Sequence, residues 1–177
     1  MNYLPKLFKT GAIRETPRRI IARIADEVSF SPGPATVVEL GAGLGEITKP
    51  VINKAKDKDK LSYFAFEIDE ESCQHLRRHF PQVQVISESA FEFEENIPAS
   101  ADIDYFISSI PLSFYKKEMI EDFLEKAKAR LKPDGKLIVL FSALWLIPIF
   151  KKHLPGMKLE SFFTFPPYFV VVYKHRR

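Results

Sequence analysis

The chain has 177 residues, of which 46% are apolar and 28% charged, and its formal net charge is +3. This length and composition are typical of one well-packed domain and exclude two of ordinary size, so we expect residues 1–177 to form a single domain. The mild positive charge neither requires nor excludes a nucleic-acid partner. The single cysteine, Cys73, excludes a disulfide framework and a cysteine metal cluster.

The N-terminal segment, residues 1–30, is basic and has a helical pattern. We expect Thr16 to be the N-cap of a helix and Pro17 its first residue, because apolar side chains then recur at helical spacing. Six cations precede Asp26 against one acid, and they are Lys6, Lys9, Arg14, Arg18, Arg19 and Arg23. The helix either lies on an anionic membrane surface or covers a ligand pocket with its arginines in solvent.

Strand and helix patterns alternate after this segment. Strands are predicted at 36–40, 61–66, 83–87, 103–108 and 136–141, and helices at 46–56, 69–80, 116–131 and 144–153. A turn is predicted at 132–135. Two last strands, 159–165 and 169–173, are joined by a link too short for a crossover helix, which predicts an antiparallel hairpin. The fold class is therefore α/β, with a doubly wound, Rossmann-like sheet of seven strands, mostly parallel and ending in this hairpin.

The first predicted strand leads into a glycine-rich turn, in the stretch VVELGAGLGEIT. Ligands of open α/β sheets bind beyond the carboxyl ends of the strands, so this turn is a candidate site. Gly41, Gly43 and Gly45 allow close approach to the backbone, and Glu39 disfavours a phosphate beside it. Glu67 ends the second strand, where a carboxylate accepts ribose hydroxyl hydrogens. The pattern indicates one nucleoside without a pyrophosphate; the alternative is a turn that needs glycine only for its own geometry.

This combination resembles class I S-adenosylmethionine-dependent methyltransferases over essentially the whole chain. The resemblance implies S-adenosyl-L-methionine as cofactor, with Glu39 and the glycines along its methionine part and Glu67 on its ribose. These enzymes often have an acid after the third strand that binds the adenine amino group, and the stretch SESAF offers Ser89 there, with Glu88 one residue off. The expected cofactor-binding residues are Glu39, Gly41, Gly43, Gly45, Glu67, Ile68, Ser89 and Ala90.

The fourth predicted strand ends in the stretch ISSIPLSFY, at the same edge as the glycine turn. Such a turn directs hydroxyls and backbone carbonyls toward an acceptor nitrogen, and methyl transfer to an amine depends mainly on in-line positioning. The alternative is a strand-ending turn in which Ser113 caps the next helix. The candidate catalytic residues are Ser108, Ser109, Ile110 through its carbonyl, Pro111 and Tyr115.

Two groups of methyltransferases are similar to this turn. Ribosomal RNA adenine dimethylases have Asn-Leu-Pro-Tyr, where this chain has Ser109 and Leu112 in place of Asn and Tyr, and they continue into a helical RNA-binding domain. Bacterial phospholipid N-methyltransferases have a turn like Ser-Gly-Leu-Pro-Leu, which matches residues 108–112, and a tail similar to FPPYFVVVYKHR. This second resemblance implies methylation of a phosphatidylethanolamine-type headgroup amine at a membrane surface.

We therefore expect an S-adenosylmethionine-dependent N-methyltransferase that acts on a phospholipid headgroup amine. The alternatives are an rRNA adenine N6-methyltransferase-like enzyme with RNA as partner, and a non-catalytic cofactor-binding module. His75 and His79 are four residues apart without an accompanying carboxylate motif, so we expect no metal. The longest apolar run, 137–150, is shorter than the roughly 20 residues of a membrane-spanning helix. We expect a cytoplasmic protein, and attachment to the inner face of the membrane stays open.

Overall fold

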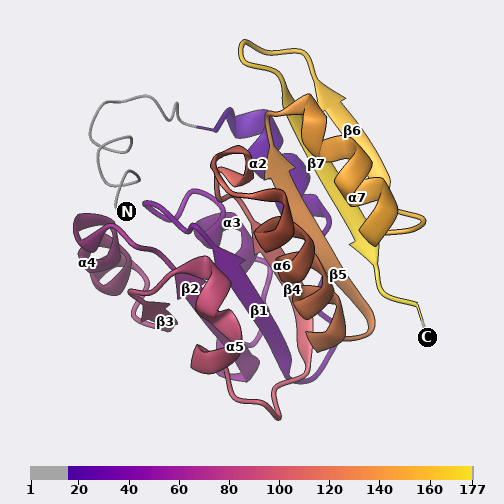
Figure 1. The fold of residues 1–177 in the computed structure, drawn as a ribbon. Coiled ribbons are helices and arrows are strands. Elements are labelled where there is room, and N and C mark those ends of the chain that lie inside the picture. The colour runs from indigo at the N-terminus through magenta and orange to yellow at the C-terminus, as the bar shows by residue number, and fades with distance from the viewer. Residues whose placement is uncertain (1–15, 177) are drawn as a thin grey trace.

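The computed structural model describes residues 16–176, which are arranged around one seven-stranded sheet (Figure 1). The strands are β1 (Ala35–Leu40), β2 (Leu61–Phe66), β3 (Val83–Ile86), β4 (Ile103–Ser108), β5 (Leu131–Phe141), β6 (Lys158–Phe162) and β7 (Tyr168–Lys174). Their order is β3-β2-β1-β4-β5-β7-β6. The first five strands pair in parallel, and β7 is antiparallel to both β5 and β6. The expected α/β fold with its C-terminal antiparallel hairpin is confirmed.

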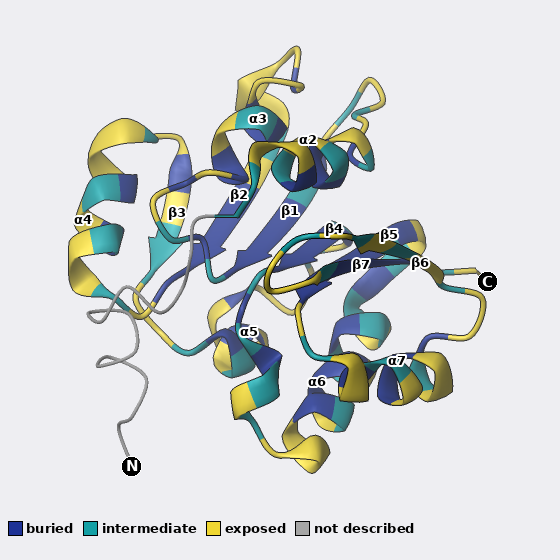
Figure 2. Ribbon diagram, turned by 90° about the horizontal axis from the view of Figure 1, so that it is seen from above, coloured by how far each residue is buried: buried dark blue, intermediate teal, exposed yellow. Residues whose placement is uncertain are grey.

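Helices cover both faces of the sheet (Figure 2). One face carries α2 (Arg18–Asp26), α3 (Thr48–Ile52) and α4 (Glu70–His79), and the other carries α5 (Phe93–Asn96), α6 (Lys117–Arg130) and α7 (Ile147–His153). Short 3₁₀ helices are η1 (Lys58–Lys60), η2 (Ala90–Glu92), η3 (Leu112–Phe114) and η4 (Leu144–Leu146). Each face has its own apolar core, because successive strand residues point to opposite sides. Val37 of β1 belongs to the core under α2 and α3, and Val38 to the core under α6.

The start of α2 differs from the prediction. Pro17 has an extended ψ of 135°, so it is the N-cap residue and the helix begins at Arg18; Thr16 is not the N-cap. Arg23 forms ion pairs with Glu27 at 2.6 Å and with Glu160 of β6 at 2.5 Å, so its guanidinium is not simply solvated. The part of the expected basic segment that contains Lys6, Lys9 and Arg14 lies outside the described residues.

The ends of other elements also differ from the prediction. Only residues 48–52 of the expected helix 46–56 are α-helical. The expected turn at 132–135 lies inside β5, where Asp134 has a φ of 68° and the register with β4 shifts. Ser113 lies within η3, and Lys116 is the N-cap residue of α6, so the alternative in which Ser113 caps that helix is wrong. Among residues 16–176, no helix has the length and apolar content to cross a bilayer.

Candidate active site

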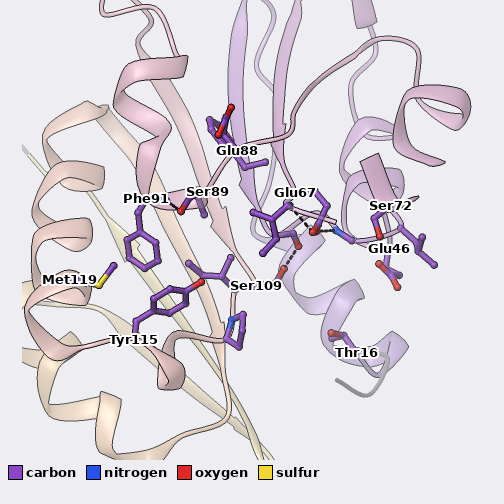
Figure 3. Close-up of a pocket in the computed structure, with 18 residues that line it drawn as sticks. Thr16, Glu46, Glu67, Ser72, Glu88, Ser89, Phe91, Ser109, Tyr115 and Met119 are labelled. Atoms are coloured by element: carbon purple, nitrogen blue, oxygen red, sulfur yellow. Dashed lines mark hydrogen bonds between the residues drawn. The ribbon is translucent and has the colours of Figure 1, made fainter. Parts of the chain in front are cut away.

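A cavity of about 470 Å³ opens at the carboxyl ends of β1 to β4 (Figure 3). The loops that follow these four strands form its wall, and Thr16, just before α2, completes it. The strand order changes direction at this point, because β2 lies on one side of β1 and β4 on the other. The cavity therefore occupies the place where open α/β sheets bind their ligands.

The glycine turn presents backbone to this cavity at one position in particular. Gly43 lines the cavity with a φ of +55°, and a Cβ added there meets only Glu46 Oε2, at 3.3 Å. Gly41 also lines the cavity. Gly45 does not: a Cβ there collides with the ring of Phe80, so this glycine serves the packing of the turn against the end of α4. The backbone of Gly43 is thus the part of the turn that a ligand can approach.

Glu67 lies at the cavity wall with its carboxylate held by backbone amides. Its Oε2 accepts the N–H of Gly43 at 2.8 Å, and its Oε1 accepts the N–H of Ile68 at 2.8 Å (Figure 3). Oε1 also accepts the N–H of Asp69 at 2.9 Å. An ionised carboxylate has about four acceptor positions, so three are filled and one is left for a ligand hydroxyl. The same contacts tie the glycine turn to the end of β2.

Glu39 has a different position from the one expected. Its Oε2 accepts hydrogen bonds from Thr48 Oγ1 and the Tyr63 hydroxyl, both at 2.5 Å, and the side chain is buried beside α3 and β2 rather than in the cavity lining. Its Oε1 is buried without a hydrogen-bond partner among residues 16–176. The pKa of Glu39 is raised to about 7, mainly by burial. The charges of Glu46 and Glu67 also raise this pKa, while the hydrogen bonds from Thr48 and Tyr63 lower it in part.

The loops after β2 and β3 bring the expected adenine-side residues into the cavity. Ile68 follows β2, while Ser89 and Ala90 follow β3, and all three line the cavity together with Glu88. Ser89 Oγ accepts the N–H of Phe91 at 3.3 Å and caps η2, so the hydroxyl has a local structural task as well. Ile68 is exposed and offers apolar surface that a flat ligand can cover.

The turn after β4 is fastened to the glycine turn. Ser109 Oγ donates to the carbonyl of Gly41 at 2.7 Å, and the Ile110 carbonyl accepts the N–H of Leu112 at 2.8 Å. Ser109, Ile110, Pro111 and Tyr115 line the cavity together. Ser108 is fully buried and outside the lining, and its Oγ has no hydrogen-bond partner in the described part of the chain.

An aromatic wall, formed by the rings of Phe91 and Tyr115 with Met119 beside them, faces the glycine turn across the cavity (Figure 3). The rings of Phe91 and Tyr115 have centroids 4.6 Å apart and are tilted by 55°. The sequence identified only Tyr115 here. The helical spacing of Met119 places it on the apolar face of α6, which is a core signal, and no pattern connects Phe91 with the cavity.

The charged side chains that line the cavity in the described part of the chain are all acidic. Glu46, Glu67 and Glu88 line it, and no lysine, arginine or histidine does so among residues 16–176. Such a wall favours a cationic or amino-bearing ligand and disfavours a phosphate. Away from the cavity, His75 and His79 stack with ring centroids 3.9 Å apart, and no group of three or more candidate metal ligands forms in the described part of the chain.

Comparisons with known proteins point to one chemistry. Residues 37–135 match a family described as a methyltransferase domain. No curated protein matches the chain.

Solved structures share the fold at low sequence identity. A TehB-like SAM-dependent methyltransferase from Corynebacterium glutamicum is 17% identical, with a TM-score of 0.62 over 99% of this chain and 97% of that one. A precorrin-6y C5,15-methyltransferase from Geobacter metallireducens is 15% identical, with a TM-score of 0.68 over 92% and 90%. A 16S rRNA N2 G1207 methyltransferase from T. thermophilus, in complex with AdoMet and guanosine, is 17% identical, with a TM-score of 0.69 over 93% and 44%.

Proposed function

The chain belongs to the methyltransferase domain family, and we propose that this S-adenosylmethionine-dependent enzyme methylates the headgroup amine of a phosphatidylethanolamine-type phospholipid. The observation that carries the proposal is the cavity lining, which contains three carboxylates and an aromatic wall and, among the described residues, no cation. This lining suits an amine and its methylated, cationic products. Arg18 and Arg19, which follow Thr16 at the cavity, are exposed and suit the phosphate of the same headgroup.

The residues at the glycine turn fit S-adenosylmethionine. When bound, this cofactor supplies an electrophilic methyl group on a positively charged sulfur. Gly43 allows the ligand to approach the backbone, the remaining acceptor position of Glu67 takes a ribose hydroxyl, and Ile68, Ser89 and Ala90 cover the adenine. Glu39 acts from beneath the turn, where its hydrogen bonds to Thr48 and Tyr63 hold the end of β1 against α3 and β2.

The turn after β4 positions the acceptor amine. The Ile110 carbonyl has a second lone pair beyond its bond to Leu112, and Ser109 Oγ accepts while it donates to Gly41. These oxygens accept N–H hydrogens and direct the nitrogen lone pair toward the methyl group. Burial raises the pKa of Tyr115, so its hydroxyl stays protonated at neutral pH. The rings of Phe91 and Tyr115 stabilise the ammonium product by cation–π contact.

An RNA adenine is the second candidate acceptor, and the aromatic wall is the observation in its favour, because flipped bases stack on such rings. One feature weighs against it. Leu112, which replaces the tyrosine of the adenine dimethylase turn, is 1% exposed and offers no stacking surface.

The proposal is tested by methyl transfer to defined acceptors. Purified protein is incubated with methyl-labelled S-adenosylmethionine and either phosphatidylethanolamine, phosphatidylglycerol, which has no amine, or ribosomal RNA. We expect label in the organic phase with phosphatidylethanolamine alone. Label in the RNA overturns the phospholipid proposal in favour of the second candidate. Label in neither acceptor overturns both, and a titration with S-adenosylhomocysteine then separates an enzyme for another acceptor from a cofactor-binding module.

A further inference from the structure

Large apolar side chains reach solvent on the connections that follow β4, β5 and β6. Phe163 and Phe165 are 96% and 90% exposed, and Phe114, Leu144 and Trp145 between 48% and 62%. These connections leave the sheet at one edge, because β4 is parallel to β5, and β7 is antiparallel to both β5 and β6. We call these five side chains the apolar rim. Single exposed apolar residues are ordinary, but several on one edge indicate an interaction surface.

The connection between β6 and β7 is folded so that its two phenylalanines project. It forms the uppermost point of the molecule in Figure 1. The N–H of Thr164 donates to the carbonyl of Phe162 at 2.9 Å, and its hydroxyl donates to the carbonyl of Pro166 at 2.7 Å. Thr164 is thereby turned toward the backbone, while the neighbours on either side of it are exposed. The outward rings therefore belong to a defined local structure.

The charges around the apolar rim are typical of a membrane interface. Residues 142–150 and 161–167, which include four of its five members, have no charged side chain. Cations stand at its borders: Lys116 and Lys117 follow Phe114, and Arg19 Nη2 donates to the carbonyl of Phe163 at 3.2 Å. Aromatic and aliphatic side chains bordered by lysine and arginine are characteristic of surfaces that enter the headgroup region of anionic bilayers.

We propose that the apolar rim inserts into the headgroup region of an anionic phospholipid membrane, with Phe163 and Phe165 as its leading anchors. The inference rests on the proposed function, because insertion of the apolar rim would place the cavity next to a lipid acceptor. Phe114 of the rim is exposed, and its neighbour Tyr115 lines the cavity. A bilayer is favoured over a second copy or another protein, because protruding rings enter a fluid interface without a complementary pocket, and the bordering cations match lipid phosphates.

Trp145 allows a test on the unmodified protein, because it is the only tryptophan of the chain and belongs to the apolar rim. Its emission is recorded with phosphatidylcholine vesicles that contain or lack phosphatidylglycerol, and with brominated acyl chains as quenchers. We expect a blue shift, quenching by the brominated lipid, and at least about tenfold tighter binding to the anionic vesicles. An emission that no vesicle changes overturns the proposal. So does a blue shift that follows protein concentration without vesicles, since it indicates a second copy.

Two variants separate the apolar rim from general hydrophobicity. The double variant Phe163→Ser, Phe165→Ser should lose at least about tenfold in vesicle partitioning. The control Leu159→Ser removes an exposed apolar side chain near the opposite end of β6 and should partition like the parent. Equal partitioning of the three proteins overturns the proposal.

Methylation in detergent distinguishes this inference from the proposed function. Phosphatidylethanolamine dispersed in detergent reaches the cavity without a bilayer, so the double variant should methylate it like the parent. If the parent methylates dispersed lipid but does not bind vesicles, the docking proposal fails and the proposed function stands. If the parent binds vesicles through the apolar rim but labels no lipid, the docking proposal stands and the acceptor assignment fails.

Discussion

Gly43 is the position at which adding a side chain should impair cofactor binding without disturbing the packing of the fold. Valine there carries a Cβ next to Glu46 Oε2 and projects into the cavity, from a backbone φ of +55°. We expect Gly43→Val to lower the affinity for S-adenosylhomocysteine at least about tenfold, measured by calorimetry. Gly156→Val is the matched control, because Gly156 also has a positive φ, of +78°, but nothing lies within 4 Å of an added Cβ. Equal losses in both variants contradict the assignment of this turn to the cofactor.

Glu67 tests the ribose contact. Glu67→Gln keeps the size of the side chain but removes its charge, and it replaces one acceptor oxygen with an NH2 group that faces backbone N–H donors and cannot accept their hydrogen bonds. We expect cofactor binding to weaken by about 1 to 3 kcal/mol, the range of a charge-assisted hydrogen bond. The measurement is the dissociation constant of S-adenosylhomocysteine, with Glu88→Gln as control on the same cavity wall. An unchanged constant in Glu67→Gln means that the ribose lies elsewhere.

Glu39 makes stability depend on pH in a predictable direction. Its pKa is raised by burial from an ordinary 4.5 to about 7, so the folded state holds its proton more tightly than the unfolded chain does. Unfolding therefore releases a proton between these two values, and the free energy of unfolding falls as pH rises through this window. Between pH 5.5 and 8 the fall amounts to about 2 kcal/mol.

The variant Glu39→Gln isolates this effect. It has no proton to release, so its free energy of unfolding should rise relative to the parent by about 2 kcal/mol between pH 5.5 and 8. Urea unfolding at several pH values measures the difference. A gap between variant and parent that stays constant over this range shows that Glu39 is not the group that titrates.

At the scale of elements, the sheet was predictable because its strands are apolar runs with short, polar or glycine-containing ends. The prediction for β2 and β4 coincides with the observed bounds. α5 was missed, since its four residues are too short for a helical period, and β5 was predicted five residues too short, because the Pro-Asp-Gly turn within it resembles a loop. Local sequence rules fail where pairing with a neighbouring strand overrides turn propensity.

The site was predictable where its residues follow strands and less so elsewhere. Gly43, Glu67 and Ser89 lie in loops at the carboxyl edge, which chain order alone locates. Glu39 lies inside β1, where side chains alternate between faces, and it shares the face of Val37 beside α3 rather than the cavity. Phe91 joins the cavity because its ring packs against Phe123 of α6 and against Tyr115.

Among the arginines of α2, Arg23 forms the ion pairs that add to the apolar attachment of the helix at the sheet. Its guanidinium joins Glu27 of the same face to Glu160 of the edge strand β6. We expect Arg23→Ala to lower the free energy of unfolding by about 1 kcal/mol, because the pairs are partly shielded from solvent. Arg18→Ala, at an exposed position of the same helix, should change it by less than about 0.5 kcal/mol. Urea unfolding compares them, and equal losses contradict the assigned role of Arg23.

At the scale of the whole molecule, the cavity and both cores depend on the same strands. β1 places Val37 in one core and Val38 in the other, and β4 does the same with Tyr105 and Phe106. If the helices on either face detach, they expose apolar side chains of β1 and β4. The same two strands carry the glycine turn and the acceptor turn, so each turn depends on both faces. Ligand binding at the cavity should therefore stabilise the sheet with both of its faces, not a local part of it.

This coupling gives the last prediction, which concerns thermal unfolding. S-adenosylhomocysteine at a hundredfold excess over its dissociation constant adds about 2.7 kcal/mol to the stability of the folded state. For a chain of this length, each kcal/mol raises Tm by about 2 to 4 °C, so Tm should rise by about 5 to 10 °C in a single calorimetric transition. Gly43→Val at the same ligand concentration should show a much smaller rise. Two separate transitions, of which the ligand moves only one, contradict the coupling, because one face of the sheet then unfolds without the cavity.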